Sequence, residues 1–185
     1  MNFNELRDRA YKSACEHGFY DKKYSDEHWK MQIICEVAEM VEAHRDGDFA
    51  DVEAFKKSDT VNDCDFNDKF NRFIKDTMED EMADVAILLL SYSGLKGYEV
   101  DWHIQSAINI LKSLGGKGSL CEYGFRITKE LTCIDSESKY EENVVASILV
   151  SLYTVAQEKR IDLLWHIEQK MRYNEMRPML NGKRY

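Results

Sequence analysis

Two acidic couplets at helical spacing are the residues of this chain that are best suited to chemistry. Glu36 and Glu39 are three residues apart in one apolar run, and Glu81 and Asp84 have the same spacing in another. Because residues three apart lie on one face of a helix, each couplet directs two carboxylates to the same side. Carboxylates on two facing helices supply the oxygen ligands that a hard cation such as Mg²⁺ prefers. The alternative is that both couplets are exposed edges of amphipathic helices.

A second group of polar residues lies near the end of the sequence. Lys170, Asn174 and Arg177 are spaced at i, i+4 and i+7, which places them on one stripe of a helix. The planar guanidinium of Arg and the compact charge of Lys suit phosphate oxygens, although cations also favour a solvated helix terminus. Phosphoryl-transfer sites need both a divalent cation and basic residues, because these share the developing negative charge.

Helices are the elements that must position these residues. The chain has 185 residues, of which 44% are hydrophobic and 32% are charged, as is common for one compact soluble domain. There is a single proline, and alternating β-branched patterns are scarce. The sequence therefore predicts an all-α helical bundle in which residues 1–185 form one domain.

Apolar periodicity and turn residues predict three long helices before residue 98, over residues 5–17, 27–45 and 69–92. We expect Asn4 to cap the first helix, and Gly94 and Gly97 to end the third. Residues 46–72 are acidic and polar, and are expected to form a mobile insertion with one short helix. Residues 85–90 are apolar on every side, which predicts a buried helix whose acidic couplet is paired, protonated or bound to metal.

Two short segments indicate an internal duplication. Trp102-His-Ile follows the predicted buried helix, and Trp165-His-Ile follows a second apolar run. Aligning them places no acidic residue of the second half on Glu81 or Asp84. The first half, residues 1–97, would then hold the metal ligands, and residues 98–185 would supply packing and a basic tail. The glycines of residues 115–118 lie near the boundary and lack the spacing of a P-loop.

Charge and cysteine content exclude several classes of partner. The net charge of −9 argues against nucleic acid or an anionic membrane as a partner, and no apolar run approaches membrane-spanning length. The polar N-terminal residues do not form a signal peptide, so we expect a cytoplasmic protein. Its cysteines show no CxxC spacing and are expected to be reduced thiols: Cys15, Cys35, Cys64, Cys121 and Cys133.

The motifs together resemble the all-α nucleoside triphosphate pyrophosphohydrolases of the MazG-like superfamily. This superfamily includes the dimeric dUTPases, the dCTP pyrophosphatases and the phosphoribosyl-ATP pyrophosphohydrolases. The features that carry the resemblance are Gly18-Phe19-Tyr20, the two acidic couplets, and the tail from Lys170 through Asn174 and Arg177-Pro178 to Gly182-Lys183. These motifs occur in the same order as in the superfamily and span nearly the whole chain. The gap between the couplets is longer than in short members, and the insertion that fills it is a candidate lid.

The resemblance implies hydrolysis between the α- and β-phosphates of a nucleoside triphosphate, which yields a nucleoside monophosphate and pyrophosphate. Glu36, Glu39, Glu81 and Asp84 would hold Mg²⁺, for which Mn²⁺ would be a substitute. Glu36 and Glu39 are the candidate catalytic residues, and Glu36 is favoured as the base that accepts a proton from the attacking water.

The same resemblance assigns the substrate contacts. The phosphates would be held by Lys170, Asn174, Arg177 and Lys183. The base would stack on Phe19, Tyr20 or Trp29, each of which is otherwise a core residue, and Gln32 would read a base edge. Members of the superfamily are commonly dimers or tetramers, so a homodimer is expected unless the duplicated chain is itself a pseudo-dimer.

Other functions are compatible with the same residues. Within enzymes, the alternative is a phosphoribosyl-ATP pyrophosphohydrolase. A non-catalytic nucleotide sensor or assembly module would keep the fold without turnover. A helical interaction protein would carry both charged groups on its surface.

Overall fold

The computed structural model describes residues 2–58, 63–101, 104, 118–133, 138 and 140–182, with the backbone alone for 63–65. In these residues all regular structure is helical, which confirms the all-α prediction. The helices are, in chain order, α1 (Phe3–Glu16), α2 (Asp26–Asp46), α3 (Val52–Lys57), α4 (Asp63–Phe73), α5 (Met78–Lys96), α7 (Leu120–Cys133), α8 (Glu141–Glu158), α9 (Leu163–Glu175) and the 3₁₀ turn η1 (Met179–Gly182).

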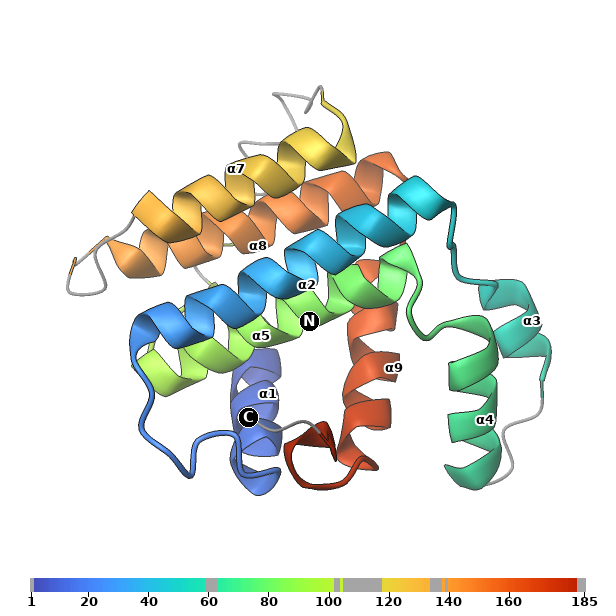
Figure 1. Cartoon of the computed structure of the whole chain (residues 1–185). Coiled ribbons are helices and arrows are strands. Elements are labelled where there is room, and N and C mark those ends of the chain that lie inside the picture. The colour runs from blue at the N-terminus through green and yellow to red at the C-terminus, as the bar shows by residue number, and fades with distance from the viewer. Residues whose placement is uncertain are drawn as a thin grey trace.

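Helix α5 is the centre of the molecule. It runs antiparallel to α2, with α7 and α8 on one side of this pair and α1 and α9 on the other (Figure 1). Its buried residues extend around the helix from Met78 to Ser93, as the uninterrupted apolar sequence predicts. The main hydrophobic core draws on α1, α2, α5, α7, α8 and α9. Within the described ranges, no helix combines the length and hydrophobicity that a membrane crossing requires.

The predicted start of the third long helix, near residue 69, is wrong. Helix α4 ends at Phe73, and α5 begins only at Met78. Between them, Asp76 has a left-handed backbone with φ of 61°, and Thr77 caps α5 by accepting a hydrogen bond from the Asp80 amide. A left-handed residue breaks the α-helical path, so a pattern of apolar residues that spans it belongs to separate helices.

Two capping predictions also need correction. Asn2, not Asn4, caps α1, and its side chain accepts a hydrogen bond from the Asn4 amide. Gly94 lies inside α5, which continues to Lys96 and ends at Gly97 in the left-handed conformation. A Cβ atom on Gly94 would lie 2.4 Å from the Cβ of Tyr11. Gly94 therefore allows close approach of α1 to α5.

The insertion contains two helices where one was predicted. Helices α3 and α4 pack on each other around a small hydrophobic core, made of Phe55, Phe66, Phe70 and Ile74. Trp165 and Tyr173 of α9 pack against this core, and the Tyr173 ring stacks on Phe70 with centroids 4.4 Å apart. The described part of the insertion thus rests on α9.

The internal duplication stays a prediction. Trp102 and His103, on which the alignment depends, lie outside the described residues.

Candidate functional site

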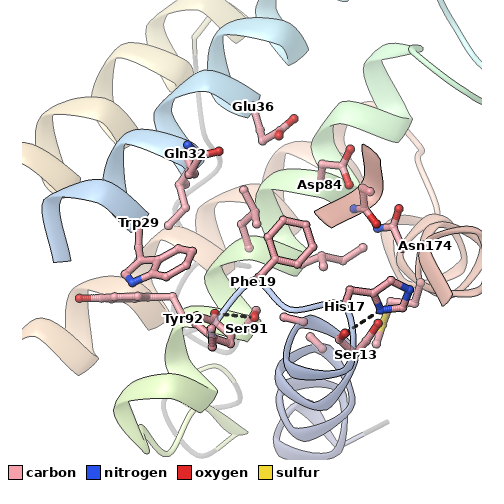
Figure 2. Close-up of a pocket in the computed structure, with 18 of the residues that line it drawn as sticks. Ser13, His17, Phe19, Trp29, Gln32, Glu36, Asp84, Ser91, Tyr92 and Asn174 are labelled. Carbon is pink, nitrogen blue, oxygen red and sulfur yellow. Dashed lines mark hydrogen bonds between the residues drawn. The ribbon is translucent and has the colours of Figure 1, made fainter. Parts of the chain in front are cut away.

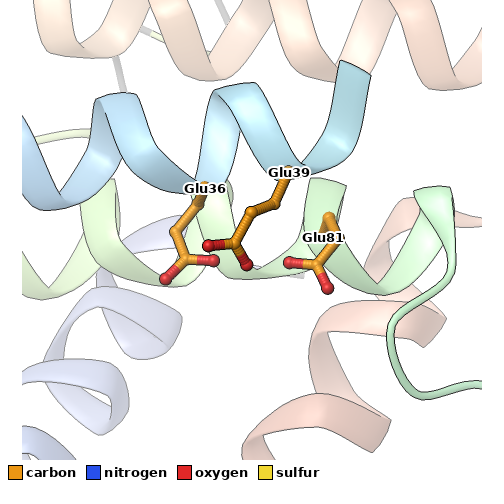
Figure 3. A group of neighbouring side chains, drawn as sticks. All are labelled: Glu36, Glu39 and Glu81. Atoms are coloured by element: carbon orange, nitrogen blue, oxygen red, sulfur yellow. The ribbon is translucent and has the colours of Figure 1, made fainter. Parts of the chain in front are cut away.

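Three carboxylates from α2 and α5 converge. Glu36 and Glu39 of α2 and Glu81 of α5 each offer one oxygen, and these oxygens lie within 4.8 Å of one another (Figure 3). Glu36 and Glu81 are only 8% and 6% exposed, whereas Glu39 is exposed. The three-residue spacing places Glu36 and Glu39 on the same face of α2, and that face meets α5. We call Glu36, Glu39 and Glu81 the carboxylate cluster.

The chemistry of the carboxylate cluster suits a divalent cation. Three carboxylate oxygens are hard ligands of the kind that Mg²⁺ and Mn²⁺ accept. Burial, and then the negative charge of Asp84, raise the pKa of Glu81 to about 8. These effects outweigh the positive charge of the nearby Lys170, and a bound cation would favour the ionised form of Glu81 further. Glu81 also belongs to a second group of converging carboxylate oxygens, with Asp76 and Asp80.

Asp84, the fourth predicted metal ligand, is paired with a lysine instead of joining the carboxylate cluster. Its Oδ2 lies 2.7 Å from the Nζ of Lys170, and Asp80 Oδ2 lies at the same distance. Burial opposes the charge of Lys170, but the two carboxylates outweigh it and raise the pKa of the lysine. Burial also raises the pKa of Asp80 to about 6, in spite of the nearby lysine.

Lys170 is therefore placed differently from a surface phosphate ligand. It is 4% exposed, and its ammonium group is engaged with Asp80 and Asp84. In this position it holds the Asp84 carboxylate at the wall of the adjacent cleft, which Asp84 lines. Lys183, the last predicted phosphate ligand, lies outside the described residues.

The cleft lies between α1, α2, α5 and α9 and comprises about 970 Å³, including its open mouth (Figure 2). Glu36 belongs to both the carboxylate cluster and the cleft wall. The other predicted substrate contacts on the described residues all line the cleft, namely Phe19, Tyr20, Trp29, Gln32, Asn174 and Arg177. The structure thus brings together side chains that are up to 158 positions apart, from residue 19 to residue 177.

The aromatic residues of the cleft are not equally available to a ligand. The Tyr20 hydroxyl is within 2.7 Å of the Ser91 hydroxyl, and burial raises the pKa of Tyr20. The Trp29 ring packs against Tyr20 with centroids 4.8 Å apart. Phe19 and Trp29 also line a second pocket near Gly18, so these two rings contribute to the walls of both cavities.

Sequence reasoning missed several residues of the site. Asp80 shares a face of α5 with Asp84, four residues further on, and this i, i+4 relation was a usable signal. His17, Ser91 and Asn181 also line the cleft. They carry no motif, and the fold alone brings them to the site.

Comparisons of the chain with models of known protein families, with curated proteins and with solved structures returned no match. The resemblance to the MazG-like superfamily therefore rests on the sequence motifs alone.

Proposed function

We propose that this chain is a Mg²⁺-dependent nucleoside triphosphate pyrophosphohydrolase, which releases a nucleoside monophosphate and pyrophosphate. The observation that carries the proposal is the dual position of Glu36, which borders both the carboxylate cluster and the cleft. A cation held there would face a ligand in the cleft. The motif resemblance supports the same reaction.

The residues of the carboxylate cluster have defined tasks in this proposal. Glu36, Glu39 and Glu81 hold the cation. When bound, a divalent cation neutralises phosphate charge and lowers the pKa of water. Glu36 is the residue of the cluster that lines the cleft, so it accepts the proton of the attacking water. Lys170 acts indirectly, by fixing the orientation of Asp84.

The walls of the cleft bind the rest of the substrate. Arg177 supplies the guanidinium that pairs with phosphate oxygens. Phe19 and Trp29 offer ring faces to a nucleobase, whereas Tyr20 is held by Ser91 and contributes mainly to the wall. Gln32 is one turn before Glu36 on α2 and offers its amide to a base edge.

The test measures pyrophosphate release from a panel of canonical and modified NTPs and dNTPs, with Mg²⁺, with Mn²⁺ and with EDTA. We expect release with either metal and none with EDTA. Glu36→Gln removes both a cation ligand and the base, so the rate should fall by about 100-fold or more. Glu42→Gln is the matched control, because Glu42 lies further along α2, is exposed and pairs with Arg45.

The outcomes separate the competing functions. Metal-dependent nucleotide binding without pyrophosphate release would replace the enzyme with a nucleotide sensor. Equal loss of activity in Glu36→Gln and Glu42→Gln would contradict the assignment of the cluster. A thermal unfolding temperature that does not change with Mg²⁺ would contradict the metal site itself.

A further inference from the structure

The insertion formed by α3 and α4 packs against the part of α9 that carries Lys170. The Tyr173 ring stacks on the buried Phe70 ring, with centroids 4.4 Å apart and planes inclined by 16°. The Tyr173 hydroxyl donates to Asn71 Oδ1 at 2.8 Å. Tyr173 is three residues after Lys170 and so shares its face of α9. The Lys170 Nζ itself lies 5.8 Å from the centre of the Phe70 ring, so the insertion contacts α9 directly at this lysine.

The linker from α4 to α5 supports the same lysine by a second route. The Asp76 amide donates to Asp80 Oδ2 at 3.1 Å, and this oxygen lies 2.7 Å from the Lys170 Nζ. Asp80 is 1% exposed, so close packing restricts the movement of its carboxylate. A backbone bond from the linker thus fixes the oxygen that holds the ammonium group.

The ends of the insertion are bonded to the start of α5. The Met78 amide donates to the Asp48 carbonyl at 2.9 Å, and the Ala50 amide donates to the Glu79 carboxylate at 3.0 Å. A lid would have to leave the site to admit a ligand. These bonds, together with the stacked rings on α9, instead keep the insertion against the two helices that carry Lys170 and its carboxylates.

We propose that the insertion is a rigid support for the candidate site, in which Asp80 and Tyr173 are positioning residues that hold Lys170. The Lys170 Nζ, 2.7 Å from Asp84 Oδ2, transmits this support to the wall of the cleft. Neither Asp80 nor Tyr173 lines the cleft, so both act through Lys170 and not on a ligand. The inference rests on the proposed function for the claim that the position of Asp84 matters to a reaction.

The test observes the Lys170 ammonium group directly, by proton–nitrogen correlation NMR of the lysine side chains in EDTA and without nucleotide. An ammonium group in water exchanges its protons rapidly and gives no signal, whereas a buried and bonded one exchanges slowly. Lys170 should give a signal, identified by its absence from Lys170→Met. Lys30, which is buried and paired with Glu141, should give a second signal that serves as the internal reference.

Tyr173→Leu removes the stacked ring, and Asp80→Ala removes the fixed carboxylate. Each variant should lose the Lys170 signal to exchange with water and keep the Lys30 signal. Tyr173→Phe is the matched control for the first variant, because it removes the hydroxyl and keeps the ring. Glu79→Ala is the matched control for the second, because the Glu79 carboxylate bonds the insertion backbone instead. Both controls should keep both signals.

The inference and the proposed function can fail separately. The spectra need neither metal nor nucleotide, so the expected signals without pyrophosphate release would contradict the hydrolysis alone. Where release is observed, Tyr173→Leu should lower kcat by about 10-fold and leave KM nearly unchanged, because it displaces Asp84 without touching the substrate. Release with the wild-type kcat in Tyr173→Leu would contradict the positioning role alone.

Three results of the NMR experiment would overturn the inference. The first is a wild-type spectrum that has the Lys30 signal and lacks that of Lys170. The second is a Lys170 signal that persists in both Tyr173→Leu and Asp80→Ala. The third is loss of both lysine signals in both variants, because the contacts would then support the whole fold and not Lys170 in particular. Loss of the Lys170 signal in one variant alone would assign the positioning role to that residue and remove it from the other.

Discussion

Two groups of buried charged residues lie toward opposite ends of α5. In one group hydrogen-bond donors and cations satisfy the carboxylate, and in the other the carboxylates outnumber the cations. Toward the C-terminal end, Glu141 of α8 is 1% exposed and is surrounded by donors. It accepts hydrogen bonds from the hydroxyls of Tyr92 at 3.0 Å and Tyr98 at 2.5 Å. It also pairs with Lys30 at 2.8 Å. Here the protein itself satisfies one buried carboxylate.

At the N-terminal end of α5 the carboxylates are in excess. Asp80 and Asp84 share Lys170, and Glu81 is repelled by both of them and by Glu36, so that its pKa is raised by burial and by these negative charges. The difference shows how one helix supports two roles. The Glu141 carboxylate has enough donors to join parts of the fold, whereas the carboxylates at the N-terminal end of α5 keep an excess of negative charge, which a cation would offset if one binds as proposed.

The largest effect is expected from Glu141→Gln. The substitution removes the buried negative charge that pairs with Lys30 and accepts hydrogen bonds from Tyr92 and Tyr98, so the free energy of unfolding should fall by about 3 to 5 kcal/mol. Chemical denaturation, with and without Mg²⁺, measures the loss. Glu158→Gln, at the exposed end of the same helix, should change little. A loss that Mg²⁺ repairs would show that the two charge groups are not separate.

Lys170→Met should cost somewhat less, about 2 to 4 kcal/mol without Mg²⁺, because Asp80 and Asp84 lose their shared cation but can take up protons. Added Mg²⁺ should recover part of the loss, since a cation again compensates the carboxylates. Denaturation curves at several Mg²⁺ concentrations test this. Identical losses with and without Mg²⁺ would remove the distinction between the two ends of α5.

In EDTA, stability should fall as the pH rises from 6 to 8. The pKa of Glu81 is raised from its ordinary value of 4.5 to about 8 in the folded chain. The stabilisation that comes from the raised pKa of Glu81 is therefore fully present below the pKa of the unfolded chain. It is lost as the pH rises through the pKa of the folded chain. We expect a decrease of about 1 to 2 kcal/mol over this range. The stability of Glu81→Gln, measured by thermal unfolding, should not fall in this way between pH 6 and 8. If the stability of the wild-type chain is also constant over this range, the raised pKa of Glu81 is contradicted.

The smallest effect is expected from Tyr98→Phe. It removes one of the donors around Glu141 and leaves Tyr92 and Lys30 in place. Loss of a single hydrogen bond should lower the free energy of unfolding by about 1 kcal/mol. A much larger loss, measured by denaturation at neutral pH, would indicate that the Glu141 group acts as a cooperative network.

The sequence alone predicted the helical class, which follows from local periodicity. It also predicted that the two acidic couplets face each other, and three of the four residues converge, whereas Asp84 pairs with Lys170. The predicted α2, over residues 27–45, differs by one residue at each end from Asp26–Asp46. The break at Asp76 was missed, since a single left-handed residue leaves the apolar pattern around it intact. Spacing on one helix specifies which face a residue occupies, and Asn174 and Arg177, which share the predicted stripe, both line the cleft; their contact with phosphate stays a prediction.

What could not be predicted depends on contacts between distant segments. Lys170 shares its stripe with Asn174, yet it is directed to Asp80 and Asp84 on α5, and no local pattern encodes that partner. Asn181 enters the cleft because η1 bonds to the end of α1. The role of Lys170 as a phosphate ligand was predicted from its helical stripe and from the resemblance, and neither indicates that its ammonium group is paired with Asp80 and Asp84.

Gly94 has a consequence for the geometry of the cleft. It lies at the crossing of α1 and α5, where the absence of a side chain lets Tyr11 approach. The same two helices form facing walls of the cleft, through Ser13 and His17 on one side and Asp84 and Ser91 on the other. A larger residue at Gly94 would act as a wedge between these walls. The spacing of two helices that line the cleft thus depends on a residue that does not itself line it.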